Sequence, residues 1–372
     1  MNVLFDSFPR LQKKMPYVAL ADLPTPVQRM ERLERALDGA VGALYIKRDD
    51  LSGKPYGGNK ARKLEFLLGK ALRDGRKAVL TFGAAGSNHA LATAIYARQL
   101  GLDCISMLVP QPNAHSVRRN LLMGYHVGAE LHHHRNMLSV AAAALCVMVG
   151  RRLRDGRLPQ IIPPGGSSPL GMIGFVNAGV ELKRQIEARV VPHPDVIYVA
   201  SGTMGTAVGL LLGLKIAGIR ARLMAVRVTD PAFTSMRKAR RFFRAATELL
   251  HDEDSTFPPL DFPETAFVLR HDHYGKKYAL YTEEGIQAVR RVEDTEGIHL
   301  EGTYTGKTFA ALLADAQAGL LQGKTVLFWN TYDSHDFSTE IAGMDYHALP
   351  KGFHRYFEED VQPLDRAPHS AY

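Results

Sequence analysis

The stretch Gly57-Gly58-Asn59-Lys60-Ala61-Arg62-Lys63-Leu64-Glu65-Phe66-Leu67-Leu68 begins as a loop and ends as a helix. Its two glycines permit positive φ angles and close approach of the backbone. Asn59 is a good residue to cap a helix N-terminus, and the apolar residues that follow recur at i, i+3, i+4 and i+7 on one helical face. Lys60 is therefore expected in the first turn of this helix.

A lysine is electrostatically misplaced there, because cations favour the other end of a helix. The plainer interpretation is a surface lysine whose stem lies along the helix. The alternative is a lysine whose ammonium pKa is lowered, ready to form a Schiff base. The rest of the chain has to decide between the two.

Composition limits the class of protein. The 372 residues can bury a large core, in two lobes, and 46% hydrophobic with 23% charged residues is ordinary for a soluble enzyme. Cys104 and Cys146 both lie in apolar surroundings, which predicts buried, reduced thiols and a cytoplasmic setting. No apolar run is long enough for a secretory signal or a membrane span, so we expect no membrane partner.

The net charge of +8 comes from scattered basic residues, with small clusters at 151–154 and 237–241. Solvated helix faces explain such clusters more often than a nucleic-acid interface does, and we expect no nucleic-acid partner. An anionic substrate or cofactor is another explanation of the charge.

Strands and helices alternate from residue 78, and the pattern restarts after Pro192-His193-Pro194. This alternation predicts an α/β fold with parallel sheets and helices on both faces. We place a small domain at 62–178 and a large domain at 1–61 and 179–372. Lys60, Ser87 and Ser201 follow strands, and ligands of open α/β sheets bind beyond strand carboxyl ends, so three loops are expected to face one cleft.

The segment Ser201-Gly202-Thr203-Met204-Gly205-Thr206 follows a buried strand and opens a helix. Exposed N–H groups, hydroxyls and the helix dipole together suit a phosphate. The spacing matches neither a P-loop nor a dinucleotide fingerprint, so a small phosphate is favoured over a nucleotide. A tight turn without a ligand remains the alternative.

Ser87-Asn88-His89 occupies a similar turn. Ser87 is suited to bind a substrate carboxylate or to carry a proton, and Asn88 to cap the helix and hold a carboxylate; capping alone is the alternative. His89 suits a core position, and no metal site is expected because ligand spacing is missing. A loop lysine, a phosphate turn and this turn together suggest pyridoxal 5′-phosphate (PLP).

Five motifs resemble the D-cysteine desulfhydrase / 1-aminocyclopropane-1-carboxylate deaminase family, whose members are PLP enzymes of the two-lobed tryptophan synthase β-like fold (fold type II). They cover about residues 20–330 in the family's order. They are Lys47-Arg48-Asp49-Asp50, Gly57 to Glu65, Gly86-Ser87-Asn88-His89, Pro164-Gly165-Gly166-Ser167 and Tyr304-Thr305-Gly306-Lys307.

The resemblance implies roles for matching residues. Lys60 would form the Schiff base and move a substrate proton, Asn59 would bond the cofactor 3′-oxygen, and residues 201–206 would hold the phosphate. Ser87, Asn88 and His89 would bind the substrate carboxylate, with Ser87 also catalytic. The catalytic phenols would be Tyr304 and, less securely matched, Tyr278, and further cofactor contacts would come from Thr305 and Thr331. The family also implies a homodimer.

The residue after Tyr304 discriminates within the family. The ring-opening deaminases carry a glutamate there, which keeps the pyridine nitrogen protonated, whereas Thr305 matches the desulfhydrases. A neutral hydroxyl gives a weaker electron sink, adequate for expelling a thiolate, so D-cysteine to pyruvate, ammonia and sulfide is the predicted reaction. The alternatives are the cyclopropane deaminase, another D-amino-acid eliminase or racemase and, remotely, a non-enzymatic PLP- or nucleic-acid-binding protein.

Three departures from the family pattern bear on this prediction. Asn330-Thr331-Tyr332-Asp333 carries two side chains where the family often has glycines, Met204 stands where glycine is common, and Gly275-Lys276-Lys277-Tyr278-Ala279 replaces a glycine-rich pattern. A bulky, charged pocket floor would shift substrate choice or abolish the family activity while PLP still binds.

Overall fold

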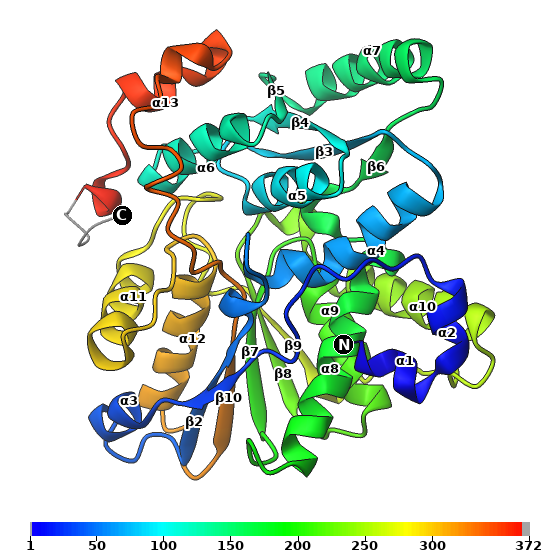
Figure 1. The fold of residues 1–372 in the computed structure, drawn as a ribbon. Coiled ribbons are helices and arrows are strands. Elements are labelled where there is room, and N and C mark those ends of the chain that lie inside the picture. The colour runs from blue at the N-terminus through cyan, green and yellow to red at the C-terminus, as the bar shows by residue number, and fades with distance from the viewer. Residues whose placement is uncertain (1, 367–372) are drawn as a thin grey trace. The chain divides into compact units, whose positions relative to one another are not determined.

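The computed structural model describes residues 2–366, which form two compact units (Figure 1). The first unit comprises the residues up to 15, 21–63 and 167–334, and the second 16–20, 64–166 and those from 335 on. The sequence-based domain boundaries were drawn at 61/62 and 178/179, with the C-terminal tail in the large domain. None of the helices in the described residues is long and apolar enough to cross a membrane.

The first unit is built on a six-stranded sheet in the order β1-β2-β10-β7-β8-β9. All neighbours are parallel except β1, which pairs antiparallel with β2 at one edge. The strands are β1 (Val27–Arg29), β2 (Ala43–Arg48), β7 (Val196–Ser201), β8 (Arg222–Arg227), β9 (Phe267–Arg270) and β10 (Thr325–Asn330).

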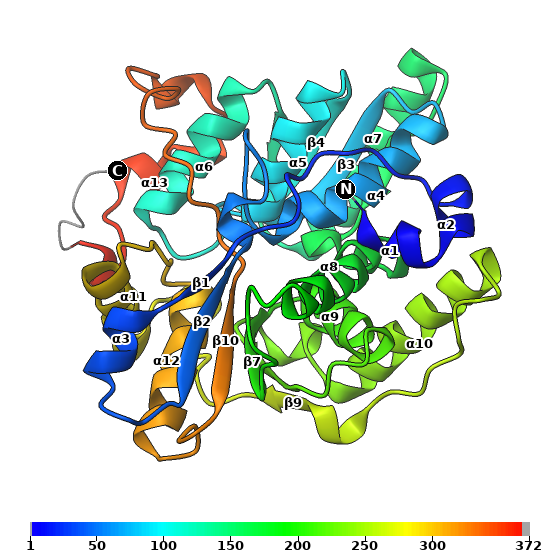
Figure 2. The same ribbon diagram turned by 60° about the horizontal axis from the view of Figure 1, so that its bottom comes forward.

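Helices cover both faces of this sheet (Figure 2). One face forms an apolar core with α3 (Glu31–Ala36), α11 (Glu283–Glu296) and α12 (Thr305–Gln317). The other face carries α8 (Pro169–Glu187) and α9 (Gly205–Ile216), with α10 (Met236–Glu253) packed on that pair. Two short helices, α1 (Val3–Ser7) and α2 (Pro9–Lys14), precede the sheet.

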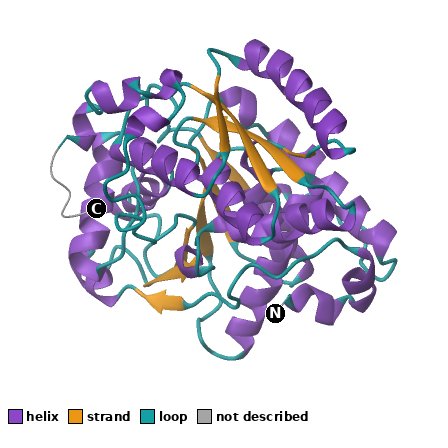
Figure 3. Cartoon of the chain, turned by 45° about the horizontal axis from the view of Figure 1, so that its top comes forward, coloured by secondary structure: helices purple, strands orange, loops and turns teal. Residues whose placement is uncertain are grey.

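The second unit contains a four-stranded parallel sheet in the order β5-β4-β3-β6 (Figure 3). Helix α7 packs against β3 and β4 to form its apolar core. Its strands are β3 (Ala78–Ala84), β4 (Asp103–Val109), β5 (Glu130–His133) and β6 (Gln160–Ile162), and its helices are α5 (Asn88–Gln99), α6 (His115–His126), α7 (Met137–Asp155) and α13 (Arg355–Glu358). Helix α4 (Asn59–Arg73) begins in the first unit and continues into the second.

The predicted α/β class with parallel sheets is confirmed, but several local expectations were wrong. Strands β1 and β9 were missed, since both are only three or four residues long. The sequence pattern predicts a helix from Phe233 to Leu250, but α10 begins at Met236 because Ser235 caps it. It also predicts an irregular tail beyond Asp345, where the structure has short helical turns. Cys104 is buried as predicted, but Cys146 is exposed on α7.

A buried charge network fixes the start of α4. The Arg62 guanidinium contacts Asp49 at 2.7 Å and Glu181 at 2.9 Å, and Lys47 Nζ lies 2.6 Å from the same Glu181 carboxylate. Trp329 Nε1 donates to Asp49 at 2.8 Å. All four charged side chains are at most 2% exposed, so the network ties α4 to β2, β10 and α8 two residues after Lys60.

Electrostatics within this network are strong. Burial alone would raise the pKa of the Glu181 carboxyl, but Arg62 and Lys47 outweigh it and hold the pKa at about 2. Removal of one partner from a buried ion pair leaves the others uncompensated, which costs more than the pair contributes when intact.

We therefore expect Glu181→Gln to lower the free energy of unfolding by about 3–5 kcal/mol, measured by urea denaturation. The control is Glu187→Gln on the same helix, whose side chain is 62% exposed and whose loss should change stability little. An equal effect of the two variants would contradict the assignment.

The same carboxyl predicts a pH dependence. Its folded pKa of about 2 lies below its ordinary value of 4.5, so its stabilisation is fully present above pH 4.5 and is lost as the pH falls toward 2. The stability difference between wild type and Glu181→Gln should shrink over that window, measured as unfolding free energy against pH.

Candidate active site

Lys60 lies beside the predicted phosphate turn. Its Nζ donates to Asn59 Oδ1 at 2.8 Å, and Asn59 Nδ2 donates to Thr206 Oγ1 at 2.9 Å. Asn59 is the first residue of α4, and its side chain bonds to these two groups. The amine is thus two hydrogen bonds from residues 201–206.

Two glycines make this approach possible. A Cβ built on Gly57 would lie 1.9 Å from the Asp50 carbonyl oxygen, and one on Gly58 would lie 2.8 Å from the Thr331 carbonyl oxygen. Gly58 also has a φ of +80°, which favours glycine. Asn59 N donates to that Thr331 carbonyl at 3.1 Å, so the lysine loop lies directly on the end of β10.

Burial lowers the pKa of Lys60 to about 8, against a smaller opposing effect of the Glu301 carboxylate. An amine with this pKa is unprotonated more often at neutral pH than an ordinary lysine, and the neutral amine is the form that attacks a carbonyl. These properties favour the Schiff-base interpretation of Lys60 over a surface role.

The turn between β7 and α9 has the properties of an anion site. Met204 precedes the first residue of α9 and makes no side-chain capping bond, so the first-turn N–H groups after Gly205 are not capped by it. Ser167 adds a hydroxyl: its Oγ accepts from Gly205 N at 3.2 Å and lies 2.6 Å from Thr203 Oγ1. A Cβ on Gly205 would lie 2.5 Å from that oxygen, so only glycine lets Ser167 join the turn.

Two departures from the family pattern keep a glycine-like backbone. Met204 has a φ of +76° and Ala279 a φ of +59°, both in the left-handed region where a side chain is strained. Each stands where the family pattern carries glycine. The backbone path is therefore retained at a cost in strain.

The two tyrosines predicted to be catalytic, Tyr278 and Tyr304, contact each other. The hydroxyl oxygens of Tyr278 and Tyr304 lie 2.5 Å apart, and a Cβ on Gly202 would be 3.9 Å from the Tyr304 ring. Burial raises the pKa of Tyr278 to about 12 and that of Tyr304 well above its ordinary value. Both phenols are therefore protonated at neutral pH and can donate hydrogen bonds.

Glu301 was not singled out from the sequence, yet it holds the start of α12. Its carboxylate accepts from the backbone N–H groups of Thr303 at 2.8 Å, Tyr304 at 2.5 Å and Thr305 at 2.9 Å. Thr305 is fully buried, and its hydroxyl accepts from Glu301 N at 2.8 Å. An acid a few residues before a helix start was the available signal.

Ser87, Asn88 and His89 lie together in the second unit. Ser87, and not Asn88, caps α5, since its Oγ accepts from Ala90 N at 3.2 Å. His89 is 3% exposed. Asn120 on α6, which the sequence analysis missed, donates to Asn88 Oδ1 at 2.8 Å; 32 residues of separation gave no signal.

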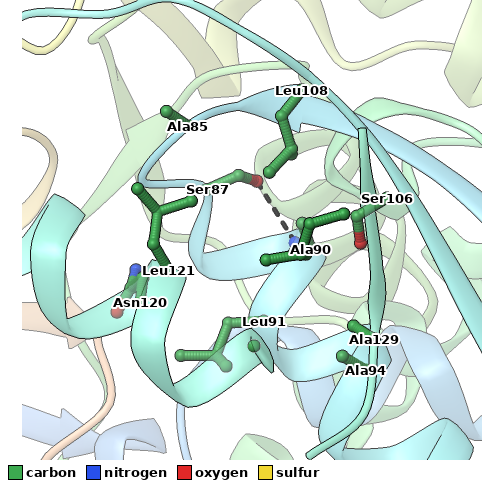
Figure 4. Close-up of a pocket in the computed structure, with 12 residues that line it drawn as sticks. Ala85, Ser87, Ala90, Leu91, Ala94, Ser106, Leu108, Asn120, Leu121 and Ala129 are labelled. Carbon is green, nitrogen blue, oxygen red and sulfur yellow. Dashed lines mark hydrogen bonds between the residues drawn. The ribbon is translucent and has the colours of Figure 1, made fainter. Parts of the chain in front are cut away.

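A small cavity lies behind this turn (Figure 4). Its volume is about 10 Å³, enough for about one water molecule. Ser87, Asn120 and Ser106 contribute the polar part of the lining, and the rest is apolar residues of α5, β4, α6 and β5 and of the loops before α5 and β5. The turn therefore has little room to collapse inward.

Tyr332 and Asp333 are engaged by neighbours in the first unit. Asp333 Oδ1 accepts from Gly57 N at 2.6 Å, and the Tyr332 ring lies 5.7 Å from that of His299. The carboxylate that replaces a family glycine thus supports the lysine loop.

A lysine beside a predicted phosphate turn in an α/β fold is the arrangement expected of a PLP-dependent enzyme. A comparison with protein-family profiles matches residues 18–331 to the family described as "Pyridoxal-phosphate dependent enzyme". The chain belongs to this family, and PLP is its cofactor.

Curated relatives narrow the class. A "Putative 1-aminocyclopropane-1-carboxylate deaminase" of Pyrococcus horikoshii is 37% identical over 322 residues, 86% of this chain and 93% of that protein. A "D-cysteine desulfhydrase" of Klebsiella pneumoniae is 33% identical over 304 residues, 81% and 88% of the two chains. The protein is thus a deaminase- or desulfhydrase-like PLP enzyme.

Solved structures agree with the fold. The crystal structure of an ACC deaminase homologue superposes with a TM-score of 0.74 at 33% identity, covering 90% of this chain and 97% of that one. The processed form of threonine deaminase isoform 2 from Solanum lycopersicum gives a TM-score of 0.56 at 18% identity, covering 92% and 88%. The predicted tryptophan synthase β-like fold type II is confirmed.

The lowered pKa of Lys60 predicts how PLP is captured. The rate at which apoenzyme gains the visible absorption of bound cofactor should rise with pH around a midpoint near 8, and not near 10.5. Lys60→Ala should not gain the band, whereas Lys70→Ala, a control on the same helix but outside the site, should match wild type. A midpoint near 10.5 would show that the amine is not desolvated.

Proposed function

We propose that this chain catalyses the β-elimination of D-cysteine, in which D-cysteine and water give pyruvate, ammonia and sulfide. The observation that carries the proposal is Thr305, a fully buried neutral hydroxyl at the start of α12. The neighbouring carboxylate, Glu301, is committed to three backbone N–H groups, so it does not replace the glutamate of the ring-opening enzymes. A neutral partner suits a substrate with a good leaving group.

The bound cofactor supplies an electron sink for the carbanion at the substrate α-carbon. Lys60 would hold the cofactor's aldehyde carbon, and its amine would accept the substrate α-proton, a task that suits a pKa near 8. The turn of residues 201–206 would hold the phosphate, Asn59 would bond the 3′-oxygen, and Thr305 and Thr331 would complete the contacts. Ser87, Asn88 and His89 bind the substrate carboxylate.

The phenol pair serves the leaving group. Tyr278 and Tyr304 share a short hydrogen bond and remain protonated at neutral pH. One phenol can therefore donate a proton to the departing thiolate while its neighbour stabilises the charge left behind.

The second candidate is cyclopropane ring opening, favoured by the name of the Pyrococcus horikoshii relative. Elimination or racemisation of another D-amino acid is a further alternative. A nucleic-acid role finds little support, because cluster arginines pair with acids: Arg151 with Asp103 and Glu130, and Arg240 with Glu264.

A substrate panel tests the proposal. Holoenzyme should release sulfide and pyruvate from D-cysteine at least tenfold faster than it releases 2-oxobutanoate from 1-aminocyclopropane-1-carboxylate, with L-cysteine and D-serine completing the panel. Thr305→Glu should move the ratio toward ring opening, because a carboxylate favours a protonated pyridine nitrogen. Release of 2-oxobutanoate without sulfide by wild type would reverse the assignment.

We also propose that the enzyme is cytoplasmic and forms a homodimer. Free Cys146 on the surface of α7 suits a reducing compartment. The same helix exposes apolar side chains at one face: Leu138 (83%), Leu145 (64%), Val149 (51%) and Leu153 (82%). Exposed apolar stripes mark association surfaces, and two copies of this chain related by a two-fold axis would cover the same stripe on each other.

Light scattering tests the dimer. Wild type should have about twice the mass of the 41.1 kDa chain, and Leu145→Lys with Leu153→Lys should yield monomers. Leu320→Lys, at an exposed leucine (58%) of the first unit, is the control and should remain dimeric. A monomeric wild type would end the proposal.

A further inference from the structure

Helix α6 supports the turn that carries Ser87 and Asn88. A Cβ on Gly86 would lie 2.7 Å from Val117 Cγ2, so the turn rests directly on the helix. Asn120, 4% exposed on the same helix, donates from Nδ2 to Gly86 O at 3.0 Å and to Asn88 Oδ1 at 2.8 Å. Gln111 Oε1 accepts from Gly86 N at 3.0 Å on the other side.

The orientation of the Asn120 amide follows from groups with a single hydrogen-bonding role. A backbone carbonyl can only accept, so the amide must turn its NH₂ group toward Gly86. A guanidinium can only donate, and Arg119 donates to Asn120 Oδ1 at 3.2 Å. Both neighbours therefore fix the amide in the same orientation, independently of Asn88.

This orientation decides what the turn can offer a ligand. Because Asn120 donates to Asn88 Oδ1, the group that Asn88 retains for a ligand is its NH₂. Because Ser87 Oγ accepts from Ala90 N, its hydroxyl proton remains to be donated. The two side chains thus present donors at the N-terminus of α5, where the helix dipole also favours an anion.

We propose that Asn120 is a positioning residue that makes the Ser87–Asn88 turn a donor-only site, selective for the free α-carboxylate of an amino acid over the corresponding amide. The proposal rests on the proposed function in taking amino acids as the substrates. A carboxylate offers acceptors only, whereas a neutral amide brings N–H groups that would face the donors of the turn. Asn120 does not touch the ligand and acts through Asn88.

The test measures binding, so it does not depend on turnover. Holoenzyme is titrated with D-alanine and with D-alaninamide, and each dissociation constant is read from the change in the visible cofactor spectrum. Wild type should prefer the carboxylate, and Asn120→Leu and Asn120→Asp should each reduce that preference about tenfold or more. The cofactor band without ligand should be unchanged, which a general loss of structure would not allow.

A double-mutant cycle tests whether Asn120 acts on the preference through Asn88. In an Asn88→Ala background, Asn120→Leu should have a much smaller effect on the preference, because the Asn88 side chain is absent and Asn120 retains only its bond to Gly86 O. Asn88→Asp is the substitution that disturbs the turn least, because its carboxylate can still accept from Asn120. It offers the ligand an acceptor in place of the NH₂ donor, so this variant should also lose the preference for the carboxylate.

The outcomes separate this proposal from the proposed function. The role of Asn120 would be overturned if the Asn120 variants or Asn88→Asp kept the preference for D-alanine over D-alaninamide. It would also be overturned if Asn120→Leu had an undiminished effect in the Asn88→Ala background. Wild type that binds D-alanine preferentially but releases no sulfide from D-cysteine would overturn the proposed reaction alone.

Discussion

The absence of side chains at Gly57 and Gly58 is the constraint on which the site depends. A Cβ at Gly57 would fall 1.9 Å from the Asp50 carbonyl oxygen, which no rotamer or small shift can relieve. The close packing of these glycines places the lysine loop against the residues that follow β2 and β10. In this position Asn59 contacts both Thr206 and Lys60, next to the predicted phosphate turn.

A helix with a desolvated lysine in its first turn has to be held in place by other residues. Burial penalises the Lys60 charge, as its lowered pKa shows, so the first turn of α4 gains little from Lys60 itself. Arg62, two residues later, anchors that turn to Asp49 and Glu181 through four side chains that exclude solvent. Buried networks of this kind give specificity of position more than net stability, and the amine needs a fixed position.

Sequence patterns predicted the features whose signals are local. The signals of the Gly-Gly-Asn-Lys segment, of the turn at residues 201–206 and of the βα alternation each lie within a few residues. The structure confirms the parallel βα units and starts a helix after each of the two loops, whereas the cofactor roles of these loops stay predictions. Asn120 and Ser167 were missed because they act on residues more than 30 positions away. The capping role was given to Asn88 because asparagine and serine have similar preferences as caps, and only the backbone path selects Ser87.

The prediction that both cysteines are buried rested on their apolar neighbours in the sequence, and it was wrong for Cys146. Cys146 lies among alanines, leucines and valines, yet it faces outward because α7 carries apolar residues on more than one face. The sequence shows that Met204 and Ala279 stand where the family pattern carries glycine, but it does not show their backbone conformation. Both residues have positive φ angles, so the backbone keeps the conformation that glycine would adopt.

The tail beyond the family match adds a constraint of its own. Residues 18–331 match the family profile, and Tyr356 lies outside them, yet its hydroxyl accepts from Gln111 N at 3.1 Å while Gln111 Oε1 holds Gly86 N. Arg118 and Asn113 bind backbone carbonyls of the same tail segment. These bonds limit the motion of Gly86, one residue before Ser87. A rigid turn loses less conformational freedom when a ligand binds, so under the proposed function the tail would favour binding of the substrate carboxylate.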